Sequence, residues 1–445
     1  MGKRILITSI PSWNQKIGSN TFSSLFSTFD STDLANIYIQ GDLPDVKVCS
    51  RYFHIEESSV IRSIFYPCIK TGQEVKVETN HQTSGGSNHR RIKRHRLLLW
   101  ARELAWKSGR WKSRELNEFL HDFNPEVLVF PIEDYPYFNR LNQYIIDYCK
   151  PEKVIGYFWD DNFSYKQHPY SLVFKIERFF RRFRIRNLVR QCTDILAISP
   201  KMKRECDEQF SIDSVVLTKP ILKNSSFTDY EVRFPIKVLY TGKLIIGRAK
   251  TISKIVSAIR DINKGEMKLF LDIYTQTVLS KKEREKICID GCCELHAPVP
   301  QSRVIELQEQ ADILLFAESL SNKDLTARLS FSTKLTDYFA AGKCIWAVGN
   351  AELGPIDYIK TENAGFVSTN ENEIYAVLDE ITKDPNIVSQ RAAFAFECGR
   401  RNHSKEMVMK KLNEIINSPV GGGKILIFNQ MYNELYGQYS LNIAL

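Results

Sequence analysis

The 445-residue sequence predicts an α/β protein with two doubly wound, parallel-sheet domains. Three observations support this class. Short apolar runs alternate with amphipathic helical patterns, as they do in β-α-β units. Residues 219–236 interrupt the alternation with Pro220, a polar triplet at 224–226 and Pro235, which is typical of a linker. Residues 311–348 then form a complete strand–helix–strand pattern.

The first predicted domain spans residues 1–218 and contains five strands. Each strand is a short apolar run bounded by polar or turn-forming residues. The expected strands are 4–10, 36–40, 127–131, 153–158 and 194–198. A loop containing Gly18 follows the first strand and leads into a helical pattern over residues 21–29. Residues 79–89 are polar and contain two glycines, so we expect a loop there.

The second predicted domain spans residues 237–385 and repeats the alternation. Its expected strands are 237–240, 268–274, 293–297, 312–316, 344–348 and 365–367. Helical patterns over 371–383 and 386–417 close the fold. The tail, residues 420–445, opens with an apolar run similar to the first strand, but it is too short to form a domain and its role stays open.

The basic residues are concentrated in two segments. Residues 90–114 hold ten Lys/Arg and one acidic residue, and residues 172–190 hold seven and one, while the whole chain carries a net charge of only +9. The modest total, with no RNA-binding motif, argues against a nucleic-acid partner. Ten cysteines without a repeated spacing fit a reducing compartment, no apolar run approaches 18 residues, and the start does not resemble a signal peptide, so we expect a cytoplasmic protein.

The most informative segment is 332–343, which reads Ser-Thr-Lys-Leu-Thr-Asp-Tyr-Phe-Ala-Ala-Gly-Lys. Ser332 is a natural N-cap and Gly342 a natural C-terminal stop for one helix. Lys334 and Asp337 are three residues apart, so both project from one side of its first turn. Helix N–H groups and a lysine attract phosphates, and a carboxylate accepts hydrogen bonds from ribose hydroxyls. The segment therefore predicts a site for a nucleoside diphosphate.

A second basic segment follows the strand 237–240. It reads Thr241-Gly242-Lys243-Leu244 and then Gly247-Arg248-Ala249-Lys250, so its glycines would let a ligand approach the backbone closely. Cleaving a sugar–phosphate bond builds negative charge on the leaving diphosphate, which fixed cations can stabilise. The alternative, a divalent metal held by Asp-x-Asp, has no matching motif here, since Asp160 and Asp161 are adjacent. We therefore expect no metal and no cofactor.

The segment 332–343 resembles the donor-site helix of glycosyltransferase family 4, also called group 1, which has the form Pro-Ser-Lys-Leu-x-Glu-Tyr-Leu-Ala-x-Gly-Lys-Pro-Val. Ser332, Thr333, Asp337 and Cys344 stand in for the first proline, the serine, the glutamate and the second proline of that pattern. The resemblance implies the GT-B architecture, in which two Rossmann-like domains face each other across a cleft. It also implies that the closing helices, 386–419, cross back to the first domain.

The resemblance also assigns roles on the donor side. Lys243 and Lys250 match the two cations that hold the donor diphosphate, with Arg248 as a near neighbour. Gly18 and Gly242 fall in loops beside the phosphates. Ser332, Thr333, Lys334 and Asp337 complete the expected donor site.

Carboxylates near the sugar and the acceptor are less well defined. The family's first glutamate is replaced here by Leu329, and Glu318, after the preceding strand, could supply a carboxylate near the sugar instead. Asp160 and Asp161 follow the strand 153–158 and should face the cleft, where either could orient the acceptor hydroxyl. They could equally be helix-capping residues of a turn.

The resemblance implies a glycosyltransferase of the hexosyltransferase type. It would move a sugar from a UDP- or GDP-sugar to a saccharide or lipid-linked saccharide, without a metal and with retention at the anomeric carbon, in cell-surface polysaccharide synthesis. Two alternatives share the fold: a nucleotide-sugar 2-epimerase and a non-catalytic partner with a degenerate site. A dinucleotide-dependent oxidoreductase is disfavoured because no Gly-x-Gly-x-x-Gly follows the first strand.

Residues 172–190 predict an amphipathic helix with an apolar face and an arginine face. The apolar face holds Leu172, Ile176, Phe179, Phe180 and Phe183, and the other face Arg178, Arg181 and Arg182. Such a helix can lie on anionic lipid, or it can cover the sheet and show a solvated basic face. The segment 90–114 adds Trp100, Trp106 and Trp111 beside arginines, as at membrane interfaces. We therefore expect peripheral attachment to the inner membrane face through both segments.

Overall fold

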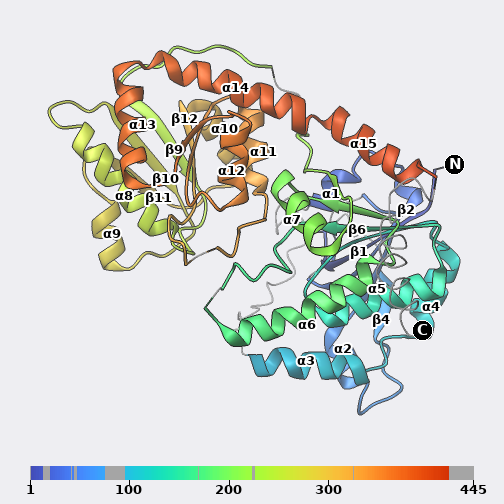
Figure 1. Ribbon diagram of the computed structural model, residues 1–445. Coiled ribbons are helices and arrows are strands. Elements are labelled where there is room, and N and C mark those ends of the chain that lie inside the picture. Colours follow the sequence, from blue (N-terminus) through green and yellow to red (C-terminus); the bar gives the residue numbers. More distant parts are fainter. Residues whose placement is uncertain are drawn as a thin grey trace, which may run out of the picture.

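The computed structural model describes residues 2–13, 21–41, 43–44, 48–75, 96–168, 170–222, 226–323 and 325–419. The chain forms two α/β domains, each built on one sheet, and this confirms the predicted fold class (Figure 1). The predicted loop at Gly18, the loop at 79–89 and the tail 420–445 lie outside the described residues. No helix in the described ranges is long and apolar enough to cross a membrane.

The first sheet has eight strands in the order β4-β3-β2-β1-β5-β6-β7-β8. Its strands are β1 Ile5–Pro11, β2 Leu34–Gln40, β3 Arg51–Ile55, β4 Gly72–Val75, β5 Val127–Pro131, β6 Lys153–Phe158, β7 Asp194–Ala197 and β8 Val215–Val216. All pairs are parallel except β3 with β4, at one edge. The carboxyl ends of the parallel strands therefore share one edge of the sheet, where ligands bind in such folds.

Helices cover both faces of this sheet. They are α1 Thr21–Leu25, the 3-10 helix η2 Ser31–Asp33, α2 Glu57–Arg62, α3 Arg96–Ser108, α4 Arg114–Phe123, α5 Pro136–Cys149, α6 Leu172–Val189 and α7 Pro200–Phe210. Serine side chains cap the amino ends of α4, α6 and α7. The helix expected over 21–29 ends at Leu25, because the chain tightens into a turn in which Phe29 N donates to Phe26 O.

The second sheet is fully parallel, with the order β11-β10-β9-β12-β13-β14. Its strands are β9 Ile236–Thr241, β10 Leu269–Tyr274, β11 Cys293–His296, β12 Ile313–Ala317, β13 Cys344–Val348 and β14 Phe366–Ser368. Its helices are α8 Arg248–Ile262, α9 Lys281–Ile287, α10 Gln301–Gln310, α11 Thr333–Ala341, α12 Gly354–Thr361 and α13 Glu371–Lys383. The strand β9 lies between β10 and β12, so the segments after β9 and β12 meet at the carboxyl edge.

The predicted helical run 386–417 is two helices, α14 Asn386–His403 and α15 Lys405–Asn417. The break at Ser404 has a non-local cause, because Ile221 of the linker donates its N–H to the carbonyl of His403 (2.8 Å). In Figure 1, α14 runs along the second domain and α15 continues over the first. There the buried ammonium group of Lys153 donates to the carbonyl of Ile415 and to Ser418 Oγ (2.6 Å).

A fully buried arginine joins the two domains. Arg328 follows β12 in the second domain, and its guanidinium group forms two hydrogen bonds with the carboxylate of Glu205 on α7 of the first. It also donates to Ser164 Oγ (3.1 Å), and its Nε lies 3.7 Å from Asp161 Oδ2. Burial lowers the pKa of Arg328, but the hydrogen bonds with Glu205 and the charges of Glu205 and Asp161 raise it by more. The pKa is therefore above its usual value, and the group stays charged.

We expect Arg328→Ala to lower the free energy of unfolding by roughly 3–5 kcal/mol, because it leaves buried carboxylates without their partner. Urea unfolding followed by circular dichroism measures this change. The control is Arg204→Ala, which breaks the solvent-exposed interdomain pair with Asp357 (3.2 Å) and should cost no more than about 1 kcal/mol. Equal effects of the two variants would contradict a structural role for the buried cluster.

Candidate functional site

Helix α11 begins at the carboxyl edge of the second sheet, as the segment 332–343 predicted. Ser332 occupies the N-cap position and Gly342 the C-cap, where φ is +63°, a conformation that glycine adopts readily. Within the described residues, the Ser332 side chain makes no capping hydrogen bond with the helix. Leu335 N donates to the carbonyl of Ser332 (3.0 Å), so the N–H groups of Thr333 and Lys334 are the ones left for an external acceptor.

Lys334 of α11 lies against Gly242, the residue that follows β9. A Cβ atom on Gly242 would come within 2.0 Å of the Lys334 ammonium nitrogen, and the φ of +148° at Gly242 also favours glycine. The same nitrogen lies 5.3 Å from the centroid of the Tyr240 ring. Burial, with the nearby charge of Arg248, lowers the pKa of Lys334 to about 8. The site thus holds a partly desolvated cation close to bare backbone.

Arg248 and Glu318 form a two-point ion pair beside Lys334. Arg248 Nε lies 2.8 Å from Glu318 Oε2, and Arg248 Nη2 lies 2.6 Å from Oε1. Burial lowers the pKa of Arg248, but the bonds and charge of Glu318 raise it by more. Glu318 directly follows β12 and Arg248 begins α8, so adjacent strands bring the two together. The predicted sugar carboxylate, Glu318, therefore orients the arginine in this structure.

Asp337 faces Lys219, a residue that sequence reasoning missed. Lys219 Nζ lies 3.9 Å from Asp337 Oδ1, and the lysine is 6% exposed. Burial raises the pKa of Asp337, while the charges of Lys219 and Lys334 oppose that shift. Lys219 lies in the linker before a proline, and a single lysine there forms no recognisable motif. The charged partners of Asp337 therefore come from the linker as well as from the second domain.

The structure separates the two aspartates that follow β6. Asp161 is buried, accepts from Ser164 N (2.8 Å) and belongs to the Arg328 cluster; burial raises its pKa. Asp160 is exposed and accepts a hydrogen bond from Ser330 Oγ of the second domain (2.5 Å). Asp160 therefore lies between the domains, and it is the more accessible of the two for an acceptor.

Several predicted donor residues lie apart from this cluster. Lys243, Lys250 and Thr333 are exposed, and in the part of the chain that the structure describes no side-chain hydrogen bond or ion pair joins them to Lys334 or Asp337. The cation beside Lys334 is Arg248, whereas the resemblance assigned the diphosphate-holding cations to Lys243 and Lys250. The structure thus brings together Gly242, Arg248, Glu318, Lys334 and Asp337, with Ser332 at the start of α11.

A group of possible metal ligands lies outside the site, on strands β10 and β11. Its members, Asp272, Glu294 and His296, have ligand atoms within 4.8 Å of one another. His296 Nε2 is already 2.7 Å from Asp272 Oδ1, and the imidazole stacks on Tyr274. The imidazole therefore already has a hydrogen-bond partner within this group.

No protein-family model matches the sequence, and no curated protein is similar to it in sequence. Solved structures do match the fold. HepE of Anabaena, crystallised with UDP, has a TM-score of 0.57 at 8% identity, over 92% of this chain and 98% of that one. TarM gives 0.59 at 9% identity, over 94% and 99%. WaaG, a glycosyltransferase involved in lipopolysaccharide biosynthesis, gives 0.55 at 12%, over 93% and 100%.

These likenesses extend over both domains and establish the GT-B fold for this chain. They confirm the predicted architecture of two Rossmann-like domains. At such low identity the likeness concerns the fold, and the chemistry has to be argued from the cluster around Lys334.

The depressed pKa of Lys334 predicts a pH-dependent stability. Between about pH 8 and 10.5 the unfolded chain keeps a proton that the folded protein has lost, so the free energy of unfolding rises with pH in this window. Lys334→Met lacks this slope and should be more stable by roughly 1–3 kcal/mol below pH 8. Urea titrations from pH 7 to pH 10 measure both. Lys250→Met, at an exposed lysine, is the control, and parallel curves for wild type and Lys334→Met would contradict the burial of this charge.

Proposed function

We propose that this protein is a glycosyltransferase that moves a sugar from a nucleotide-sugar to a saccharide or lipid-linked saccharide. The observation that carries the proposal is the cluster at the start of α11, where Lys334 and Arg248 lie beside a helix N-terminus that has no side-chain cap. Such an arrangement binds diphosphates. HepE was crystallised with UDP and with UDP-glucose, so a UDP-sugar is the first donor to test, and a GDP-sugar the second.

The cluster suits the charge that develops in the reaction. As the bond between the anomeric carbon and the phosphate oxygen breaks, negative charge grows on the leaving diphosphate, and the acceptor oxygen forms the new bond to that carbon. This charge would be stabilised by Lys334, Arg248 and the N–H groups of α11. Asp337 would accept hydrogen bonds from the ribose hydroxyls. These fixed cations support metal-independent transfer. The leaving phosphate oxygen would take the proton of the acceptor hydroxyl, with retention of configuration.

The acceptor would enter from the first domain. Asp160 lies at the carboxyl edge of the first sheet and accepts a hydrogen bond from Ser330 across the interface, which supports a role for it in orienting an acceptor hydroxyl. A saccharide or a lipid-linked saccharide fits this assignment, in cell-surface polysaccharide synthesis at the cytoplasmic face of a membrane.

A non-catalytic binding partner is the second candidate. The position of the family's first glutamate is occupied by Leu329, which is fully buried, and Glu318 is engaged by Arg248. Both features reduce the carboxylates available to a donor sugar. Nucleotide binding without turnover of any UDP- or GDP-sugar would favour this candidate, and a changed sugar without an acceptor, followed by proton NMR, would favour a 2-epimerase.

We expect UDP to stabilise the protein and Lys334→Ala and Asp337→Asn each to weaken its binding at least about tenfold, because a charged hydrogen bond contributes roughly 1.5–3 kcal/mol. A thermal-shift screen of UDP, GDP, ADP and CMP, followed by titration of the best ligand, measures this. Ligand at one hundred times its dissociation constant stabilises by about 2.7 kcal/mol.

The matched control for these variants is Lys282→Ala, at an exposed lysine on α9. Sugar transfer to saccharide acceptors is assayed with the same variants. Unchanged binding and turnover in both Lys334→Ala and Asp337→Asn would place the donor site elsewhere.

Gly242→Ala should abolish nucleotide-dependent stabilisation, because the added Cβ displaces the Lys334 ammonium group. Gly265→Ala is the matched control: its φ is +95°, so the backbone is similarly strained, but nothing lies within 4 Å of the new Cβ. Both variants should lose about 1–3 kcal/mol of stability, and only Gly242→Ala should lose its response to UDP. An equal response to UDP in both variants would show that nucleotide binding does not require the close approach of Lys334 to the Gly242 backbone.

A further inference from the structure

Helix α6 turns its apolar face to solvent. The exposed fractions are 74% for Leu172, 60% for Ile176, 62% for Phe179, 57% for Phe180 and 61% for Phe183. The arginine face points inward: Arg178 Nη2 donates to Gln167 Oε1 (2.8 Å), Arg181 pairs with Asp134, and Arg182 Nε donates to the carbonyl of Phe163 (2.6 Å). Of the two alternatives left open by the sequence, the one with a solvated face of Arg178, Arg181 and Arg182 does not hold, because these arginines find acceptors within the protein. An exposed row of aromatic and aliphatic side chains marks a contact surface.

Helix α3 extends this surface. Trp100 is 71% exposed and Leu104 is 65% exposed. The two other tryptophans expected at a membrane interface are buried instead: Trp106 Nε1 donates to Glu57 (3.1 Å), and Trp111 Nε1 donates to the carbonyl of Trp106 (2.9 Å). Of the three, Trp100 alone can therefore reach an external partner.

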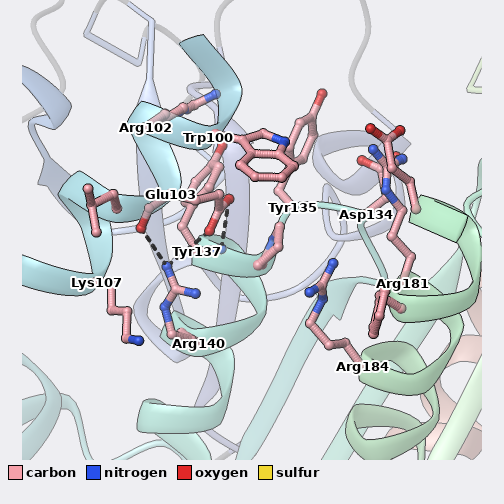
Figure 2. Close-up of a pocket in the computed structure, with 14 residues that line it drawn as sticks. Trp100, Arg102, Glu103, Lys107, Asp134, Tyr135, Tyr137, Arg140, Arg181 and Arg184 are labelled. Atoms are coloured by element: carbon pink, nitrogen blue, oxygen red, sulfur yellow. Dashed lines mark hydrogen bonds and ion pairs between the residues drawn. The ribbon is translucent and has the colours of Figure 1, made fainter. Parts of the chain in front are cut away.

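Between α3, α6 and the start of α5 lies a cavity of about 640 Å³ (Figure 2). Trp100, Tyr135 and Phe180 contribute apolar walls, and five basic and three acidic side chains also line it. The guanidinium group of Arg184 reaches into it from α6, and that of Arg140 from α5. The cavity thus combines apolar walls with an excess of basic over acidic side chains.

Part of this positive charge forms no hydrogen bond or ion pair with the residues that the structure describes, although the charges of Glu103 and Asp134 act on Arg184. Glu103 pairs with Arg140 (3.0 Å), but Arg184 and Lys107 form no hydrogen bond or ion pair within the described residues. Two further guanidinium nitrogens, Arg102 Nη2 and Arg140 Nε, also lack an acceptor there, but both are buried from solvent and so do not face the cavity. Several unsatisfied N–H donors around one cavity suit an anion with several oxygens, such as a phosphate.

The cavity adjoins the acceptor side of the proposed site. Tyr135 lies in the loop after β5, and Glu133 of the same loop accepts a hydrogen bond from Trp159 Nε1 (3.0 Å). Trp159 directly precedes Asp160. The cavity and Asp160 therefore belong to neighbouring loops at one edge of the first sheet.

We propose that this cavity binds the phosphate headgroup of an anionic membrane phospholipid, while the exposed apolar side chains of α3 and α6 enter the interfacial zone of the bilayer. The accessible cations of the cavity, Arg184 and Lys107, donate hydrogen bonds to the phosphate oxygens. Trp100 and Phe180 enter the boundary between headgroups and acyl chains, which aromatic side chains favour. The apolar row and the cationic cavity are contiguous, and this combination fits an anionic bilayer better than a soluble phosphate.

This inference deepens the proposed function, since it rests on the idea that a lipid-linked acceptor is met at a membrane surface. The docking itself needs no nucleotide. Failure of one proposal can therefore be distinguished from failure of the other.

The test is co-sedimentation of the full chain with vesicles of phosphatidylcholine, with and without phosphatidylglycerol. Wild type should bind the anionic vesicles and be released by salt. Arg184→Ser with Lys107→Ser should partition about 30-fold less, since each basic residue near an anionic surface contributes about 1 kcal/mol. Trp100→Ser with Phe180→Ser should abolish binding.

Matched controls carry the same changes on the second domain. Lys281→Ser with Lys282→Ser removes two exposed charges, and Val278→Ser with Met267→Ser removes two exposed apolar side chains, so both should bind vesicles as wild type does. Circular dichroism and the urea unfolding midpoint, which need no nucleotide, verify that every variant is folded. Lys334→Ala should lose UDP binding and keep vesicle binding.

Three results would overturn the proposal. One is equal binding to neutral and anionic vesicles. Another is equal loss of binding in the variants and their controls. The third is stabilisation of the protein by glycerol phosphate in a thermal-shift assay without any binding to vesicles. That result would assign the cavity to a small soluble anion.

Discussion

The buried guanidinium group of Arg328 determines how the two domains meet. A charge removed from water needs charged partners, and its partners, Glu205 and Asp161, both come from the other domain. In the observed docking, Arg328 forms hydrogen bonds with Glu205, and its Nε lies 3.7 Å from Asp161 Oδ2. Ser330, two residues further on, then reaches Asp160, and α11 begins shortly afterwards. The position of the proposed donor site relative to the acceptor edge therefore depends on this one arginine.

Local sequence pattern predicted most of the fold. Long apolar runs such as β5, β6 and β13 were predicted with the bounds that the structure has, because fully buried parallel strands are apolar throughout. The strands β3, β4 and β8 were missed, since they are short or lie near the edges, where alternation is weak. The break at Ser404 could not be predicted, because it comes from pairing with Ile221, far away in the sequence.

The candidate site shows the same limit. The segment 332–343 placed Lys334 and Asp337 on one turn and ended the helix at Gly342, since those relations are local. Lys219 and Tyr240 come from other parts of the chain and leave no local signal. For α6, periodicity defined two faces but not which one points inward. That choice depends on acceptors such as Asp134 and the Phe163 carbonyl, which only the tertiary structure supplies.

The contact between Lys153 and α15 has a consequence for biosynthesis. Lys153 belongs to a central strand, yet the carbonyl that receives its ammonium group, Ile415, is made 262 residues later. While the nascent chain is still on the ribosome, the first domain holds this lysine with Asp194 as its partner and an uncovered groove where α15 will lie. The amino-terminal half therefore completes its packing only after residue 415 has been made, and until then this part of its surface stays uncovered.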